Sequence, residues 1–171
     1  MNNEPVDMVA LVRGLPSRSR GKACIVLTHE YGGQKEWAAE LARRTDSEHL
    51  DLLELFAQDK RLSSKIGAFS VDGLFDFLKT ANKESSDSSF RIHHSSFPNA
   101  SVLVVSGMEF LKAAWIGQSN AVDQFLSQLK TWDKCPSLLF IMQHDKTIAS
   151  YDFGRRYQLT FVVDQKKTLK L

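Results

Sequence analysis

Hydrophobic residues gather in short runs along the chain, and several of the segments between them have helical spacing. Apolar runs rich in β-branched and aromatic residues predict buried strands at 23–27, 100–105 and 136–142. Residues 157–163 alternate in polarity, which predicts a final and more exposed strand. Residues 49–56 suit either a strand or a helix, and the shortness of this run after Asp46 and Ser47 favours a strand.

Other segments repeat their apolar side chains every three or four residues, as amphipathic helices do. This spacing predicts helices at 6–12, 35–44, 70–79 and 121–132. Ser70 is a candidate N-cap for the third of these helices. Pro and Gly punctuate residues 13–22, so we expect a loop there, and the Ser-rich residues 83–99 are expected to form the longest loop or insertion.

The alternation of strands and helices predicts the fold class. Parallel neighbours need a crossover of about a dozen residues or more, which a helix supplies, and helices then cover both faces of the sheet. We therefore expect an α/β three-layer sandwich with a mostly parallel sheet. Residues 1–22 are expected to form a short helix and a basic arm, and residues 23–171 a single domain.

Composition changes this picture little. The chain has 171 residues, of which 43% are hydrophobic and 25% charged, as in an ordinary folded domain and unlike a disordered or collagen-like chain. The formal net charge is +2, which is too small to indicate a nucleic-acid partner without a local basic patch.

Two further features indicate a cytoplasmic protein without membrane contact. No segment approaches the ~20 apolar residues of a membrane span, and the first residues lack the pattern of a secretory leader. Cys24 and Cys135 lie far apart in apolar runs, so we expect two small buried side chains and no disulfide.

The segment between the first predicted strand and helix has the length and position of a phosphate-binding loop. If Lys35 is placed on the lysine of the signature G-x-x-x-x-G-K-[ST], His29 and Gln34 stand at the two glycine positions and Glu36 at the Ser/Thr position. Gly32 and Gly33 could restore part of the turn one residue early. The alternative is a surface loop with an exposed lysine. Any vestigial nucleotide site would use Gly32, Gly33, Gln34 and Lys35.

A second departure from this signature lies after the strand at 100–105. In a phosphate-binding ATPase this strand ends in an acid that organises magnesium, and a catalytic glutamate commonly follows it. Here these positions hold Ser106 and Gly107, and the nearest carboxylate, Glu109, lies out of register. We therefore expect no metal site, no catalytic residues and no cofactor, with weak ATP binding as the alternative.

Over residues 23–163 the order of elements resembles the core of an AAA+/RecA-like P-loop NTPase, with degenerate nucleotide-binding positions. Within that class the chain is similar to the small P-loop proteins of BREX phage-defence systems, the BrxF family. The likeness includes the segments 49–52, 104–111 and 154–157. Members of that family carry an intact GKT-type loop, which this chain lacks. The resemblance implies a P-loop NTPase-like fold, in which Gln143 and His144 stand where the additional-strand class of these ATPases carries a polar sensor.

Several histidines invite a catalytic or metal-binding interpretation. His29 lies beside Glu30, and His144 beside Asp145, so either histidine could act as a general base. The sequence shows no nucleophile elbow, which favours a polar rim instead, that is, polar side chains at the strand ends without a catalytic role. His93 and His94 are adjacent and have no second ligand pair at suitable spacing, so we expect solvated loop histidines.

Arginines and tryptophans suggest contacts with partners. Arg155 and Arg156 follow Gly154 and could reach a partner protein, with a surface salt bridge as the alternative. A basic cluster near the amino terminus could make a weak, non-specific DNA contact or remain a solvated arm; it consists of Arg13, Arg18, Arg20 and Lys22. The tryptophans are expected to pack in the core or on helix faces, although one of them could anchor an interface; they are Trp37, Trp115 and Trp132.

Three functional hypotheses follow from these patterns. The first is a non-catalytic adaptor or regulatory subunit of a multi-protein assembly that works with a larger ATPase, in a phage-defence setting if the resemblance holds. The second is a weak ATPase or ATP-binding switch that uses Lys35. The third is a nucleic-acid-binding module that uses the basic cluster.

Overall fold

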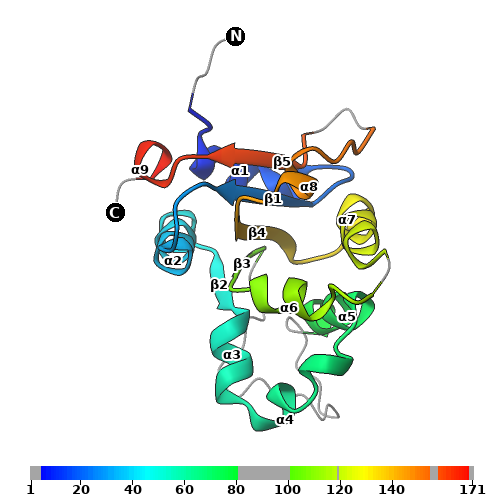
Figure 1. The fold of residues 1–171 in the computed structure, drawn as a ribbon. Coiled ribbons are helices and arrows are strands. Elements are labelled where there is room, and N and C mark those ends of the chain that lie inside the picture. Colours follow the sequence, from blue (N-terminus) through cyan, green and yellow to red (C-terminus); the bar gives the residue numbers. More distant parts are fainter. Residues whose placement is uncertain (1–4, 81–100, 119, 155–157, 170–171) are drawn as a thin grey trace.

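The strands form one parallel sheet in the computed structural model, which describes residues 5–80, 101–118, 120–154 and 158–169 (Figure 1). The strands are β1 (Ala23–Thr28), β2 (Glu48–Asp51), β3 (Val102–Ser106), β4 (Ser137–Gln143) and β5 (Thr160–Val163). Their order across the sheet is β2-β3-β4-β1-β5, and each neighbouring pair is parallel. The predicted α/β class with a parallel sheet is confirmed.

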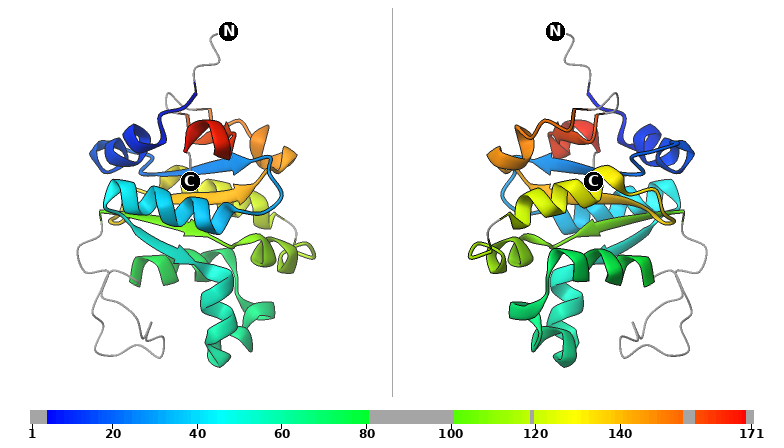
Figure 2. Two further views of the ribbon diagram at one scale, coloured as in Figure 1. Left: turned by 90° about the vertical axis from the view of Figure 1, so that its left-hand side faces the viewer. Right: turned by 90° about the vertical axis from the view of Figure 1, so that its right-hand side faces the viewer.

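Helices cover both faces of this sheet, which gives the three predicted layers (Figures 1 and 2). Those before β3 are α1 (Met8–Gly14), the 3₁₀ turn η1 (Leu15–Ser17), α2 (Gln34–Thr45), α3 (Leu52–Gln58), α4 (Lys60–Ser63), the 3₁₀ turn η2 (Ile66–Ala68) and α5 (Val71–Thr80). Those after β3 are α6 (Glu109–Ala114), α7 (Ala121–Thr131), α8 (Lys146–Ala149) and α9 (Gln165–Thr168). The expected loop at 83–99 lies outside the described residues.

Strand side chains alternate between two hydrophobic cores, one on each face of the sheet. On β4, Phe140 and Met142 join the core beneath α5, α6 and α7, whereas Leu139 and Ile141 join the core beneath α1 and α2. All four side chains are buried, because helices cover both faces. This double burial explains why the central strands read as continuous apolar runs. The three tryptophans are also buried, which confirms the prediction of core packing.

The prediction of a strand over 49–56 is wrong beyond Asp51. The strand β2 ends at Asp51, and the chain turns directly into α3. The Asp51 carboxylate accepts the backbone N–H of Glu54 at 2.8 Å, which caps the first turn of that helix. Leu52 and Phe56 then lie one helical turn apart and are both buried. The apolar residues of this run therefore follow helical periodicity, and the N-cap aspartate was the signal for it.

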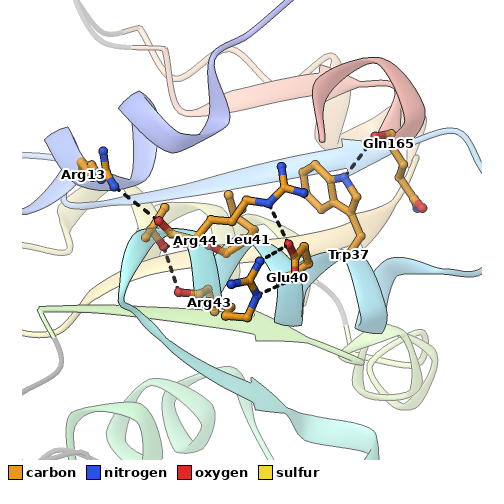
Figure 3. A network of polar contacts seen from close by, with 9 residues as sticks. Arg13, Trp37, Glu40, Leu41, Arg43, Arg44 and Gln165 are labelled. Atoms are coloured by element: carbon orange, nitrogen blue, oxygen red, sulfur yellow. Dashed lines mark hydrogen bonds and ion pairs between the residues drawn. The ribbon is translucent and has the colours of Figure 1, made fainter. Parts of the chain in front are cut away.

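The helix α2 is anchored near its start to α9 and near its end to α1 (Figure 3). The fully buried Trp37 donates its indole N–H to the backbone oxygen of Gln165 at 3.2 Å. At the other end of α2, Arg13 of α1 donates to the carbonyl oxygen of Arg44. Arg43 and Arg44 both donate to the Glu40 carboxylate and lower its pKa to about 2.

Candidate functional site

An open cleft of about 500 Å³ lies at the carboxyl ends of the strands, where ligands bind in open parallel sheets. Its walls come from the loop after β1, the start of α2, the end of β2 with α3, the residues that follow β3, and the last residue of β4. The lining residues are Gly32, Gly33, Gln34, Lys35, Glu36, Asp51, Leu53, Glu54, Ala57, Gly107, Glu109 and Gln143. The structure thus brings the four residues of the predicted vestigial nucleotide site together with carboxylates from three other segments.

The side chain of Gln34 closes the loop after β1. Its Nε2 donates to the carbonyl oxygen of Glu30 at 2.8 Å and to Oγ1 of Thr28 at 3.1 Å. Gly33, at φ 77°, is the residue before α2 and occupies the left-handed region that glycine adopts without strain. The loop is therefore held by the amide of Gln34, which stands at the position of the second signature glycine.

Gln165, the first residue of α9, clamps the same loop from the other side. Its Nε2 donates to Thr28 Oγ1 at 3.1 Å and to the carbonyl oxygen of Gly32 at 3.2 Å, and its backbone N–H donates to Glu30 Oε1 at 2.8 Å. A Cβ added to Gly33 would lie 2.9 Å from Oε1 of Gln165. The sequence interpretation missed Gln165, although a polar residue soon after a strand is the signal that singled out the other strand ends.

Lys35 forms an ion pair within the cleft. Its Nζ lies 2.9 Å from Oε2 of Glu54, and both side chains are about half exposed. The hydrogen bond to Glu54 raises the pKa of Lys35, and the carboxylates of Asp51 and Glu36 act in the same direction. The ammonium group therefore remains charged and is already matched by a carboxylate of this chain.

A buried hydroxyl joins the ends of β2 and β3. Ser106 Oγ donates to Oδ2 of Asp51 at 2.7 Å and lies 2.8 Å from Nε2 of His49. Because the single hydroxyl proton points to Asp51, Nε2 of His49 is the donor in the second bond. A nucleophilic serine needs the opposite arrangement, in which histidine accepts the hydroxyl proton. These three residues therefore do not form a hydrolase triad. Burial lowers the pKa of His49, against the opposing effect of Asp51.

The Asp51 carboxylate also lies directly over Gly107. A Cβ added to Gly107 would be 2.7 Å from Oδ2 of Asp51, and Gly107 has a φ of 72°. The strand β3 thus ends beneath a carboxylate that β2 supplies. The P-loop signature compares positions along one strand, and at the position of the acid it has Ser106. It could not reveal the carboxylate, because that side chain comes from the neighbouring strand.

Glu109 and Gln143 meet on the far side of the cleft. Glu109 Oε1 accepts the backbone N–H of Gln143 at 3.1 Å. The out-of-register Glu109 therefore lines the cleft together with Asp51 and Glu54. Beside it, Lys112 pairs with Asp145 over 2.5 Å and links α6 to the start of α8.

The two candidate general-base histidines stack on each other. The ring centroids of His29 and His144 are 4.3 Å apart, with an angle of 24° between the ring planes. The neighbouring carboxylates make other contacts. Glu30 accepts the backbone N–H of Gln165 through Oε1, and its Oε2 is buried without a hydrogen-bond partner among the described residues, whereas Asp145 accepts from Lys112. The acid beside each histidine in sequence is thus occupied by another partner, which favours the polar-rim interpretation.

Metal and thiol chemistry receive little support in the described part of the chain. Within residues 5–80, 101–118, 120–154 and 158–169, no group of three or more His, Cys, Asp or Glu side chains could hold a metal ion. His93 and His94 lie outside these residues. Cys24 is buried, and burial raises the pKa of its thiol to about 12. The expectation that Cys135 is buried is wrong, because Cys135 is exposed in the segment between α7 and β4.

The basic residues that the sequence singled out lie on different segments of the chain. Arg13 on α1 donates to the carbonyl oxygen of Arg44 at 3.4 Å, and Arg18 donates to that of Gly21 at 3.5 Å. Arg20 and Lys22 lie on the segment that leads into β1. Arg155 and Arg156, the candidate partner-binding arginines, lie outside the described residues. Among the described helices, none has the length and apolar character needed to span a membrane.

Comparisons with protein-family models, with curated proteins and with solved structures found no match to this chain. The cleft is therefore the structural feature that bears most directly on function.

Proposed function

We propose that the protein is a non-hydrolysing, P-loop-like adaptor or regulatory subunit, which acts in a multi-protein assembly with a larger ATPase. The observation that carries the proposal is the pair of hydrogen bonds from Gln34 to Thr28 and Glu30. A phosphate-binding loop must turn its backbone N–H groups toward an open space. In this loop a glutamine amide bridges the turn from within the chain.

The charges of the cleft support the same proposal. Lys35 is paired with Glu54, and Glu36, Asp51 and Glu109 add further carboxylates to the lining. A carboxylate about 5 Å from a phosphate charge costs on the order of 1–3 kcal/mol at effective dielectric constants between those of a protein surface and water. Several such groups disfavour a triphosphate, and we propose that no cofactor is needed.

The strand order supports the P-loop part of the proposal. The strand β4 lies between β1 and β3, as the inserted strand does in the additional-strand class of P-loop NTPases. The cleft also lies beyond β1 and β3, where that class binds nucleotide. A retained scaffold with altered chemistry is typical of a subunit that has kept its contacts and lost its reaction. We also propose a BREX-like phage-defence setting, which the sequence resemblance suggests, and a cytoplasmic location, which the cysteine usage favours.

A nucleotide-binding switch is the second candidate, and one observation favours it. Lys35 lines a cleft whose volume of about 500 Å³ is within the usual range of small-molecule sites. A nucleic-acid module ranks lower, because Arg13 and Arg18 each direct a hydrogen bond to a backbone carbonyl of this chain.

Phosphate release and calorimetry with ATP and Mg²⁺ test the proposal. We expect neither hydrolysis nor saturable binding by the unaltered protein. The double variant Gln34→Gly, Glu36→Thr removes the bridging amide and one carboxylate, and we expect it to gain weak nucleotide binding. Phosphate release by the unaltered protein that disappears in Lys35→Ala, but persists in the exposed-lysine control Lys60→Ala, would overturn the proposal. Nucleotide binding with the same dependence and without hydrolysis would favour the switch.

The adaptor part needs a separate measurement. Purification of the tagged protein from its native host, together with the products of neighbouring genes, should recover an ATPase subunit. Adding the purified protein to that ATPase should change its rate of hydrolysis. An unchanged rate together with absence of a complex would contradict the adaptor role.

A further inference from the structure

Two exposed apolar side chains belong to the segments that form the cleft wall. In the described ranges the exposed large hydrophobic residues are Tyr31, Leu53, Ile116 and Val162. Tyr31 is 94% exposed and directly precedes the lining residue Gly32, and Leu53 is 54% exposed and itself lines the cleft. Exposed apolar groups placed together beside a concave surface are typical of a protein-binding site.

The charges inside the cleft select the partner. Carboxylates from α2, β2, α3 and α6 meet there, whereas Lys35 is the cation among the lining residues and is matched by Glu54. Glu36 and Glu54 are both exposed. Lys35 offsets the charge of Glu54, but the carboxylates of Glu36, Asp51 and Glu109 leave the lining with an excess of negative charge. An anionic ligand would face these carboxylates, and a cationic ligand would be attracted by them.

We propose that this cleft receives an arginine of a partner protein, with an adjacent aliphatic or aromatic residue of the partner packing against Tyr31 and Leu53. This inference rests on the proposed adaptor function and names the chemistry of its docking segment. Arginine fits better than lysine, because its planar guanidinium can pair with two carboxylate oxygens at once and can also stack on an aromatic ring. Glu36, Glu54 and Tyr31 offer both kinds of contact at the mouth of the cleft.

The cleft offers separate places for the partner's arginine and for its apolar neighbour. Gly32 lines the cleft without a side chain, and a Cβ added there would meet nothing within 4 Å in the described part of the chain, so an extended segment can approach the loop backbone closely at this point. Tyr31 lies on this loop and Leu53 lies on α3, so the apolar contacts come from two different walls. A single arginine placed between them would reach the carboxylates while its neighbours cover the apolar rim.

A displayed library of random twelve-residue peptides, selected on the purified protein, tests the inference. We expect the recovered peptides to share an arginine next to an aliphatic or aromatic residue. Their synthetic versions should bind at least tenfold more weakly to two double variants. One is Glu36→Gln, Glu54→Gln, and the other is Tyr31→Ser, Leu53→Ser. Replacing the shared arginine by glutamate should abolish binding, and replacing it by lysine should weaken it.

Matched variants control for net charge and surface polarity. Glu48→Gln, Asp123→Asn removes the same number of carboxylates away from the cleft, and Ile116→Ser removes another exposed apolar side chain. Both should bind the peptides within twofold of the unaltered protein. Circular dichroism should show that all variants are folded.

Other outcomes would overturn the inference. These are a selection that yields no binders, peptides without a cationic residue, binding that the cleft variants leave unchanged, and displacement of the peptides by spermine at equal charge concentration. The last result would indicate a site for free cations. ATP hydrolysis by the unaltered protein would overturn the proposed function but leave these peptide results standing, so the two failures are distinguishable.

Discussion

Ser106 on β3 donates a 2.7 Å hydrogen bond from its hydroxyl to the Asp51 carboxylate at the end of β2. Ser106 is fully buried, so the bond lies where little water can replace it. Asp51 also caps α3 through the N–H of Glu54. One carboxylate therefore connects β3, β2 and α3 and forms part of the cleft wall.

Ser106→Ala should destabilise the protein by about 1.5–3 kcal/mol, the usual net contribution of a hydrogen bond to a charged group. The change removes the donor to Oδ2 of Asp51 and the acceptor for Nε2 of His49, whereas Oδ1 of Asp51 still accepts the N–H of Glu54. Urea denaturation followed by circular dichroism measures the difference. Ser127→Ala on the exposed face of α7 is the control and should change the free energy of unfolding by less than about 0.5 kcal/mol. Equal effects of the two changes would contradict the role given to this bond.

Ser106→Asp places an acid where a P-loop ATPase carries one, and should destabilise the protein more than Ser106→Ala. A second carboxylate would replace the hydroxyl that now lies 2.7 Å from Asp51, and like charges at this range repel strongly in a buried site. The same urea titrations give the comparison. If Ser106→Asp were more stable than Ser106→Ala, the Asp51 carboxylate would have to move away from residue 106. Adding Asp51→Asn to Ser106→Asp should then change the stability little.

Gly107→Ala should destabilise the protein by more than about 1 kcal/mol, because a non-glycine residue at φ 72° is strained. The added Cβ would also meet the Asp51 carboxylate at 2.7 Å, and two hydrogen bonds hold that carboxylate in place. Gly117→Ala is the control, since its Cβ would meet nothing within 4 Å. Thermal melting of both variants checks the difference, and matching melting temperatures would contradict it.

Much of the fold could be predicted from the sequence, because buried parallel strands and amphipathic helices leave strong periodic patterns. The runs at 23–27 and 136–142 became β1 and β4 with small shifts at their ends. The order of the strands could not be predicted, since hydrophobic pattern along one strand does not specify its neighbour. The run at 49–56 was misassigned because its length suited a strand, while Asp51 acts as a helix cap.

The candidate site was predictable only in part. Residues 32–35 lie together on one loop, so their contribution to the cleft followed from local sequence. Asp51 and Gln165 reach the site from segments distant in sequence, and only the packing of β2 and α9 beside β3 and α2 brings them there. Cys135 was wrongly expected to be buried because it borders the apolar run of β4, although it lies before the strand begins.

The free energy of unfolding should fall as the pH decreases below about 6.5, the ordinary pKa of histidine. Burial lowers the pKa of His49 in the folded protein, so between the lowered value and the ordinary one the unfolded chain binds more protons. Stability is therefore full above the ordinary pKa and is lost as the pH falls toward the lowered value. Asp51, Glu54 and Glu36 oppose this shift, and Lys35 adds to it.

His49→Gln isolates this contribution to the pH dependence. Glutamine does not titrate and can still donate a hydrogen bond to Ser106, so the variant should lose part of the decline between pH 7 and pH 5. Urea titrations at several pH values measure the difference between the two proteins. Parallel curves for the variant and the unaltered protein would show that the decline comes from other groups.

Gln165→Ala should loosen the loop after β1 while leaving the sheet intact. The change removes the hydrogen bonds to Thr28 and to the carbonyl oxygen of Gly32, whereas the backbone bond from residue 165 to Glu30 remains. We expect faster hydrogen exchange for the amides of residues 30–35 and a loss of about 1–2 kcal/mol in the free energy of unfolding. Exchange within β1 and β4 should be unchanged, because their ladder does not involve this side chain.

A double-mutant cycle with Gly33→Ala makes this prediction specific to the clamp. Gly33→Ala alone should destabilise the protein through its φ of 77° and through the approach of the new Cβ to Gln165 Oε1 at 2.9 Å. In the Gln165→Ala background the Cβ no longer meets the Gln165 side chain, and only the backbone strain remains. The two changes together should therefore lower the free energy of unfolding by less than the sum of their separate effects. Gln158→Ala, at an exposed glutamine just before β5, is the control partner and should give an additive result. Additivity between Gly33→Ala and Gln165→Ala would contradict the close approach of the Gln165 side chain to Gly33.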